Sequence, residues 1–274
     1  MKGAPAMDLD TSKAWGQASA TVSANKEVLV ALAGVFFFLP SLALALFFPQ
    51  PEPPAGAEPK QLLEMMSAFY GQIGPYMAAA TLVQVLGQLS VLTLTAQAGR
   101  ATVGDAIRAA AGGLLPYLGA QLLVVLAAMV VFGVVAMLGA VSVALAVVAG
   151  LLVLIAAIWA AIRLSLIPVV IAVEGQRNPV AVLRRSWELT QGNAGRILLF
   201  VVILALAVLV ISVVASAVVG IVLALVGGAE TARIGGSVIA ALVGAGFTVY
   251  TTICFAAIHA QLVGTAGSDQ AVFD

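Results

Sequence analysis

The chain has 274 residues, of which 62% are hydrophobic and 9% are charged, and its formal net charge is zero. A soluble domain averages about 25% charged residues, and a water-soluble fold is excluded because it could not bury so much apolar surface. The single cysteine, Cys254, excludes an internal disulfide and a thiolate metal cluster. The charge balance gives no sign of nucleic-acid binding, so we expect no nucleic-acid partner.

The N-terminal segment 1–27 is polar and rich in small residues. The first apolar run covers 28–48, which is long enough to span a bilayer and longer than the core of a cleaved signal. We therefore expect a cytoplasmic tail over 1–27, disordered or lying on the membrane surface. A transmembrane domain over 28–266 and a second cytoplasmic tail over 267–274 follow.

Six apolar stretches reach the roughly 20 residues that a spanning helix needs. They are 28–48, 72–98, 114–138, 141–162, 197–226 and 234–263. Alternation typical of strands is absent, which favours helices over a membrane barrel. The predicted fold is all-α: a polytopic membrane helix bundle of about six transmembrane helices, plus one or two cytoplasmic interfacial amphipathic helices.

The basic residues of the connections are distributed unevenly. With the N-terminus in the cytoplasm, nine basic residues lie inside, two lie outside, and Arg163 lies at the end of the fourth span. The inside set is Lys2, Lys13, Lys26, Arg100, Arg108, Arg177, Arg184, Arg185 and Arg196, and the outside set is Lys60 and Arg233. The positive-inside rule therefore predicts that both termini are cytoplasmic.

The stretch 178–192 predicts an amphipathic helix in the membrane interface. Asn178 is a suitable N-cap, Pro179 suits the first helical position, and Gly192 suits the stop. One half of its helical wheel is apolar and includes Trp187, whereas Arg184, Arg185 and Glu188 lie on the other half. The apolar half enters the acyl boundary or packs on the bundle. The alternative is a short basic loop that only sets topology.

The stretch 102–112 predicts a second interfacial helix, with Thr102 as the cap and Asp105 three residues later. Displaced by 76 positions, Arg108 falls on Arg184, which indicates either a parallel repeat of the kind found in transport folds or a chance similarity.

Arg163 follows the fourth span closely enough to reach the inner head groups, and Pro168 is placed to break the helix beyond it. Its expected acidic partner is Glu174 or Glu188. The role is either a structural anchor or a substrate-binding cation.

Four polar residues of the spans are candidates for a cavity: Gln84, Gln88, Gln121 and His259. Gln84 and Gln88 share a helix face, where they line a cavity or bond neighbouring helices. His259 is either a proton-handling group or an interfacial histidine bonded to a carbonyl.

The segment from Arg163 to Pro168, Glu174, and the run AVLRRSWELTQGN at 181–193 resemble the glycerophosphoryl diester phosphodiesterase membrane-domain family and its bacterial relatives. The resemblance implies a polytopic protein of the bacterial inner (cytoplasmic) membrane. Some members carry a phosphodiesterase barrel of about 250 residues. This chain has one histidine and no polar domain for such a barrel, so the resemblance does not extend to the enzyme activity.

We therefore expect a protein without catalytic activity, cofactor or metal, acting as an accessory or scaffold in membrane-lipid or envelope homeostasis. Its partners are membrane lipids, anionic ones foremost, and a protein partner or a second copy. The residues expected to contact head groups or a partner are Arg163, Arg177, Arg184, Arg185, Trp187 and Arg196. The alternative function is a small transporter or permease with a polar path near spans two and four. An intramembrane enzyme is disfavoured because no acid–base pair or metal set is visible.

The topology is testable by labelling. Cysteines introduced by Lys60→Cys and Arg185→Cys should react with an impermeant thiol reagent from opposite compartments, because six spans with basic inner connectors separate them. Labelling of both from the same side would contradict the arrangement.

Overall fold

The computed structural model describes residues 9–51, 53–54, 56–97 and 102–270. The chain is 89% helical, and these described residues contain no strand. Six helical segments are long and apolar enough to cross a membrane: Lys26–Phe47, Pro59–Ala96, Val103–Val141, Val143–Val173, Ala194–Gly228 and Glu230–Gly264. The predicted all-α fold with six spans is confirmed, and the protein is a multi-pass membrane protein.

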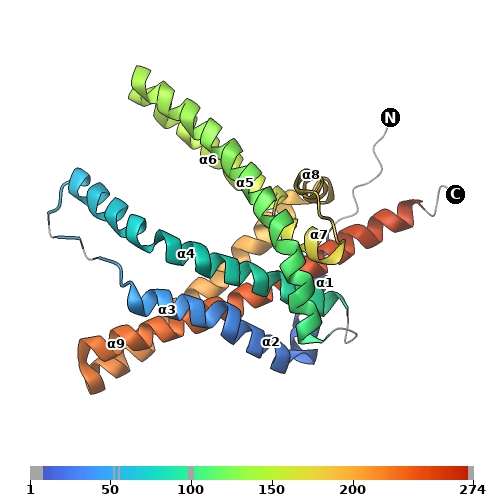
Figure 1. The fold of residues 1–274 in the computed structure, drawn as a ribbon, viewed down its shortest axis with the longest axis horizontal. Coiled ribbons are helices and arrows are strands. Elements are labelled where there is room, and N and C mark those ends of the chain that lie inside the picture. The colour runs from blue at the N-terminus through green and yellow to red at the C-terminus, as the bar shows by residue number, and fades with distance from the viewer. Residues whose placement is uncertain (1–8, 52, 55, 98–101, 271–274) are drawn as a thin grey trace. The chain divides into compact units, whose positions relative to one another are not determined.

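Figure 1 shows the helices in chain order. They are α1 (Thr11–Ala24), α2 (Lys26–Ala33), the π-helical η1 (Gly34–Phe38), α3 (Leu39–Phe47), α4 (Pro59–Ala96), α5 (Val103–Val141), α6 (Val143–Arg163), α7 (Ile167–Val173), α8 (Pro179–Leu189) and α9 (Ala194–Gln270). Within α9, Gly228 has a φ of 76° and is not helical, so α9 consists of two helices joined at this glycine.

The chain divides into two compact units. Unit 1 comprises Met1–Ala24, Leu89–Ile203 and Thr252–Asp274, and unit 2 comprises Asn25–Gln88 and Leu204–Thr251.

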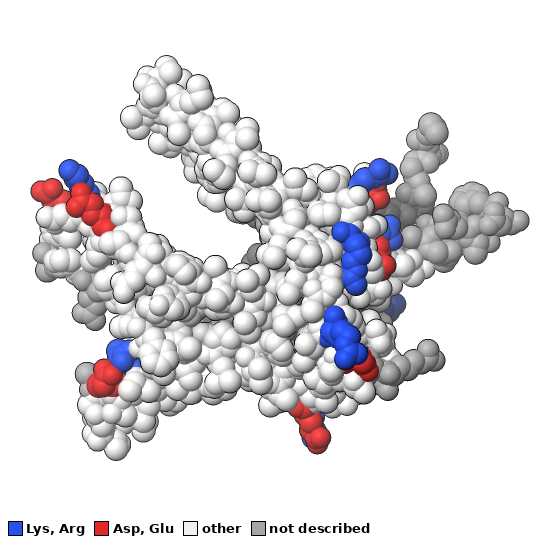
Figure 2. All heavy atoms as spheres, viewed as in Figure 1, with Lys and Arg blue, Asp and Glu red and all other residues white. Residues whose placement is uncertain are grey.

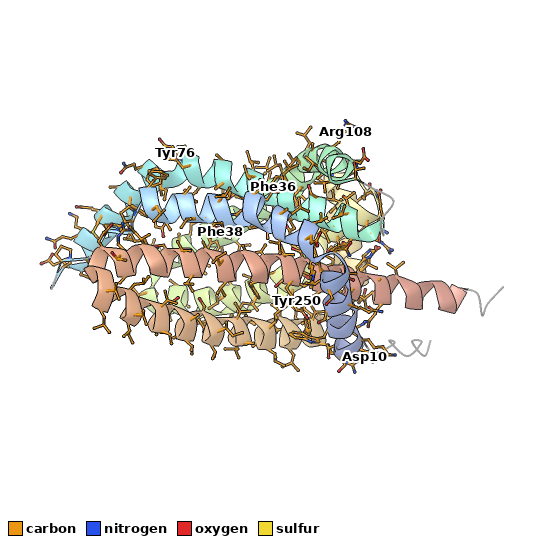
Figure 3. All side chains as sticks on the ribbon, turned by 90° about the horizontal axis from the view of Figure 1, so that it is seen from below. Asp10, Phe36, Phe38, Tyr76, Arg108 and Tyr250 are labelled. Carbon is orange, nitrogen blue, oxygen red and sulfur yellow. The ribbon has the colours of Figure 1, made fainter. Side chains whose placement is uncertain are left out.

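Unit 2 contains α2, η1 and α3, packed along α4. Phe36 and Phe37 of η1 are buried, and Figure 3 labels Phe36 on η1 and Tyr76 on α4. A Cβ added at Gly87 would collide with Phe36 and lie 2.8 Å from its Cγ, so the glycine permits the close approach of the two elements. The amide of Gln84 donates to the hydroxyl of Ser41 over 3.4 Å.

Unit 1 contains the α5–α6 hairpin, which turns at the extended residue Ser142. No Asp, Glu, Lys or Arg lies between positions 109 and 162, and the rod that these helices form in Figure 2 is free of charged atoms on the visible face. Leu115 and Met137 of this hairpin are 80% and 73% exposed. Such a surface is stable only against hydrocarbon.

The expectation that the tail 1–27 is disordered is wrong for its described part, and the alternative that it lies on the membrane surface stays a prediction. α1 is an ordered helix whose Ala14 and Ala18 are fully buried. The backbone N–H of Leu9 donates to Oδ1 of Asn193 over 3.1 Å. The helix was missed because its buried face consists of alanines, which give little amphipathic signal. At the other end, α9 continues to Gln270, and the rest of the tail predicted over 267–274 lies outside the described residues.

The expectation of a separate interfacial helix over 102–112 is also wrong. The predicted capping box is present, since Asp105 N–H donates to Thr102 Oγ1 over 3.2 Å. The helix then continues through Gly112 and Gly113 to Val141 as α5. The two glycines do not end it, because they provide space for neighbouring side chains: a Cβ at Gly113 would lie 3.0 Å from Ile171 Cγ2 and 3.1 Å from Leu89 Cδ1.

Two alanine substitutions in α4 test the packing of unit 2. Gly87→Ala should lower the unfolding midpoint in detergent, because overpacking against Phe36 costs about 1–3 kcal/mol. Gly71→Ala is the control, since a Cβ there meets nothing within 4 Å and alanine is the better helix former by up to about 1 kcal/mol. A Gly87→Ala variant as stable as the Gly71→Ala variant would contradict this packing.

Candidate functional site

The predicted helix over 178–192 is present as α8. Asn178 caps it, accepting hydrogen bonds at Oδ1 from the N–H groups of Val180 (3.0 Å) and Ala181 (3.3 Å). Pro179 lies in its first turn. Gly192, the predicted stop, has a φ of 82°, which a residue without a Cβ adopts readily.

The apolar face of α8 packs on the other helices of unit 1. Val182, Ser186 and Leu189 are buried, whereas the side chain of Arg184 on the opposite face is 79% exposed. A Cβ added at Gly119 of α5 would lie 2.7 Å from Pro179 Cγ, so the start of α8 rests on this glycine. Of the two predicted roles for the apolar face, packing on the bundle is the one observed.

The end of α6 is joined to α8 by hydroxyl groups. The backbone carbonyl of Arg163 accepts hydrogen bonds from Ser186 Oγ over 2.8 Å and from Thr190 Oγ1 over 3.3 Å. The last carbonyls of a helix lack intrahelical donors and need partners from elsewhere. Ser186 of α8 and Thr190, the residue that follows α8, therefore satisfy the last carbonyl of α6 and fix the position of α8.

The side chain of Arg163 lies against two tryptophans. The residue is 6% exposed, and its guanidinium carbon is 4.5 Å from the ring centroid of Trp187 and 6.0 Å from that of Trp159. Both distances suit cation–π attraction. Its buried Nε has no hydrogen-bond partner.

The expected pairing of Arg163 with Glu174 or Glu188 does not occur among the described residues. Glu188 accepts from Arg184 Nε over 2.7 Å, four positions earlier on the same helix. Glu174 accepts from Arg185 Nε at 3.0 and 3.1 Å. Glu174 and Glu188 are therefore each bonded to an arginine other than Arg163. The neighbours of the Arg163 guanidinium are instead the rings of Trp159 and Trp187. Pro168, in the first turn of α7, follows the break after α6 as predicted.

The described side chains of unit 1 carry an excess of positive charge. The basic set is Lys13, Arg108, Arg163, Arg177, Arg184, Arg185 and Arg196, and the acidic set is Asp10, Asp105, Glu174 and Glu188. Over the whole sequence of unit 1, nine basic and seven acidic residues leave a surplus of two positive charges. Each of the four carboxylates has a basic partner within 4.0 Å, and Figure 2 shows blue atoms gathered with red ones on this unit.

Arg177 lies over the glycine pair of α5. Its Nη1 would be 3.4 Å from a Cβ at Gly113 and 3.7 Å from one at Gly112. Arg108, on the first turns of α5, is 86% exposed in its side chain and points away from the helix in Figure 3. Arg108 is thus presented by a helix, whereas Arg177 lies in the loop between α7 and α8, against α5.

Glu174 joins three segments that are distant in sequence. It follows α7, bonds Arg185 of α8, and its Oε1 lies 2.8 Å from Nε2 of His259 in α9, which is 85 positions away. The side chains of His259 and Glu174 are 6% and 25% exposed. The sequence left two roles for His259, a proton-handling group or a histidine bonded to a backbone carbonyl. The partner observed is a carboxylate, not a backbone carbonyl.

The pKa of the Glu174 carboxyl is set by opposing effects. Partial burial raises the pKa. The hydrogen bonds from Arg185 and His259 and their positive charge lower it by a larger amount, so the pKa lies below its ordinary value. Glu174 is therefore ionised at neutral pH.

A hollow of about 550 Å³ lies beside His259. Its polar wall residues are Gln17 and Thr21 of α1, Thr95 of α4, and His259 itself, and the remaining wall is formed by alanines, Val173 and Ile253. The predicted cavity residues Gln84, Gln88 and Gln121 are not in this wall. Gln121 instead lies 2.9 Å from the hydroxyl of Tyr117, one turn earlier on α5.

Within the described part of the chain, no group of three or more His, Cys, Asp or Glu side chains could hold a metal ion. The contact that sequence reasoning missed is the Glu174–His259 pair. The only available signal was that both residues lie at the predicted cytoplasmic ends of spans.

Comparison of the chain with protein-family models, curated proteins and solved structures finds no match.

Acid unfolding tests the Glu174 pair. A carboxyl whose pKa is lowered in the folded state stabilises fully above its unfolded pKa of about 4.3, and this stabilisation is lost as the pH falls through the folded pKa. Glu174→Gln should therefore unfold more readily at neutral pH, by about 1–2 kcal/mol, and the difference from the unmodified protein should shrink below about pH 4.

The matched control is Glu188→Gln, which removes the same charge from a pair in which Glu188 is 47% and Arg184 is 79% exposed. Because water screens this pair, its stability should change little with pH. Equal behaviour of the two variants in detergent unfolding would contradict a special role for Glu174.

Proposed function

We propose that this chain is a bacterial inner-membrane protein with cytoplasmic termini that has no catalytic activity and binds anionic lipid head groups. It would serve as an accessory or scaffold protein in membrane-lipid or envelope homeostasis. The family resemblance in the segment 163–193 is consistent with this proposal, and the positive-inside asymmetry supports the orientation.

The observation that carries the proposal is the environment of Arg163. Arg163 is 6% exposed, ends α6, and has no carboxylate partner among the described residues. Its guanidinium lies against two tryptophans. An arginine at this depth costs several kcal/mol unless an anion or the interface compensates it. A lipid phosphate offers two oxygens in the geometry that a guanidinium binds best.

The tryptophans favour a lipid over a soluble anion. Trp159 and Trp187 are 48% and 41% exposed, although both contact a buried arginine. Indole rings concentrate at the boundary between acyl chains and head groups. Their exposed edges would therefore contact lipid at the depth where phosphates lie.

The surplus of two positive charges in unit 1 supports the same proposal. A basic residue close to an anionic membrane surface contributes about 1 kcal/mol. Because α8 is capped and packed, its arginines are presented without a further ordering cost.

The permease alternative receives less support. Gln84 donates to Ser41 in unit 2 and Gln121 bonds Tyr117 in unit 1. Polar groups satisfied in this way serve helix packing as readily as they line a path.

Lipid retention by the purified protein tests the proposal. In vesicles of phosphatidylcholine with and without phosphatidylglycerol, the protein should retain phosphatidylglycerol preferentially. Arg184→Gln should weaken this preference about fivefold, since about 1 kcal/mol is lost, and Arg163→Gln should weaken it more. Arg163→Lys keeps the charge but loses the planar donor group, so its preference should lie between those of the unmodified protein and Arg163→Gln.

The matched control is Arg233→Gln, which removes the same charge from the other predicted side, where Arg233 is bonded to Glu230 at 2.7 Å. It should leave retention on the cytoplasmic side unchanged. Equal retention of the two lipids by the unmodified protein would contradict the proposed function.

A further inference from the structure

The cluster of Glu174, Arg185 and His259 has a charge balance that one proton changes. The carboxylate and the guanidinium cancel, so the cluster is neutral when the imidazole is neutral and positive when it is protonated. His259 can donate from Nε2 to Glu174 in either state. Its side chain is 6% exposed, so the charge on the ring depends on these two neighbours more than on water.

Arg185 can accept a second anion. All of its bonds to Glu174 come from Nε, at 3.0 and 3.1 Å, and its side chain is 38% exposed. The two Nη amino groups make no bond to another described residue. A guanidinium can serve two anions at once because its five donors point in different directions.

We propose that Glu174, Arg185 and His259 form a proton-linked site for the phosphate of an anionic lipid, in which the phosphate binds Arg185 and His259 takes up a proton. The inference rests on the proposed function and adds a regulation to it. When the negative phosphate binds Arg185, it weakens the ion pair between Arg185 and Glu174. The Glu174 carboxylate then needs another positive charge nearby. A protonated His259 supplies this charge, and the four groups together are neutral.

The direction of the pH effect follows from linkage. Phosphate binding promotes protonation of His259, so protonation of His259 must strengthen phosphate binding by the same factor. Affinity therefore rises as the pH falls and His259 takes up its proton. A site whose only anion-binding groups are arginines would show no such pH dependence, because arginine stays protonated throughout.

The surroundings of His259 contain no other charged group that could compete for this role among the described wall residues. α7 is followed by Glu174 and α8 contributes Arg185. α1 and α4 contribute Gln17, Thr21 and Thr95, which do not ionise. In α9, Cys254 is buried. Asp10, just before α1, is paired with Lys13 of α1 at 3.7 Å. The hollow of about 550 Å³ adjoins His259.

The test measures binding of phosphatidylglycerol to the full chain in phosphatidylcholine vesicles between about pH 5.5 and 8. The unmodified protein should bind roughly fivefold or more tightly at the lower pH. His259→Gln should bind at every pH with the affinity that the unmodified protein has at high pH. Glu174→Gln releases Arg185 and should bind more tightly at high pH, with little pH dependence.

Arg184→Gln is the matched control, because Arg184 lies next to Arg185 but is paired with Glu188 and has no histidine neighbour. It should weaken binding by the same factor at all pH values. Since the chain has a single histidine, one imidazole resonance also reports the protonation of His259 in the unmodified protein. That resonance should indicate more protonated ring at a given pH when phosphatidylglycerol is present, and this readout needs no variant.

Inorganic phosphate provides a further arm. Millimolar phosphate should not displace the lipid, because the site combines the charge with the membrane interface. Full displacement would overturn a lipid site in favour of a soluble phosphate. Absence of any preference for phosphatidylglycerol, at any pH, would overturn the proposed function and this inference together. A preference that does not change with pH, or a pH dependence that persists in His259→Gln, would overturn the inference alone.

Discussion

A charged side chain in hydrocarbon cannot be solvated by water, so it must be paired with another polar group or lie outside the spans. The distribution of charge in unit 1 follows from this constraint. The hairpin of α5 and α6 carries no Asp, Glu, Lys or Arg between positions 109 and 162. Charge returns only where the hairpin ends, and there each described carboxylate of unit 1 has a basic partner. Pairing at a membrane boundary is what the cost of an isolated ion demands.

The end of α6 connects this constraint to the fold. The carbonyl of Arg163 needs a donor because its helix stops, and hydroxyls in and directly after α8 supply two. Its side chain needs a favourable contact, and Trp187 of the same α8 supplies it. One residue therefore fixes α8 through both its backbone and its side chain. The position of α8 then determines where Arg184 and Arg185 stand.

Local patterns made part of this structure predictable. The six spans follow from hydropathy alone, and α8 follows from the cap at Asn178 and the stop at Gly192, because these signals lie within a few residues of what they determine. The partner of Arg163 was not predictable, since two nearby carboxylates were equally plausible and both bind other arginines. The Glu174–His259 pair joins positions 85 apart. No periodicity reports which span ends meet.

The packing of α1 illustrates the same limit from another direction. Its buried face is made of alanines, Ala14 and Ala18, so its contact gains little from hydrophobicity and gains from close approach instead. Trp15 of the same helix meets Phe200 edge-on, with ring centroids 6.4 Å apart. A tail that reads as polar can thus still be an integral element of unit 1.

The bond from Leu9 to Asn193 has a consequence for biosynthesis. It joins residues 184 positions apart, so during translation α1 leaves the ribosome long before its partner exists. A strongly apolar segment at this place would insert into the bilayer or adhere to other nascent chains while it waited. The alanine-lined face of α1 exposes little apolar surface during this interval, and its bond to Asn193 can form only after the first four spans have been synthesised.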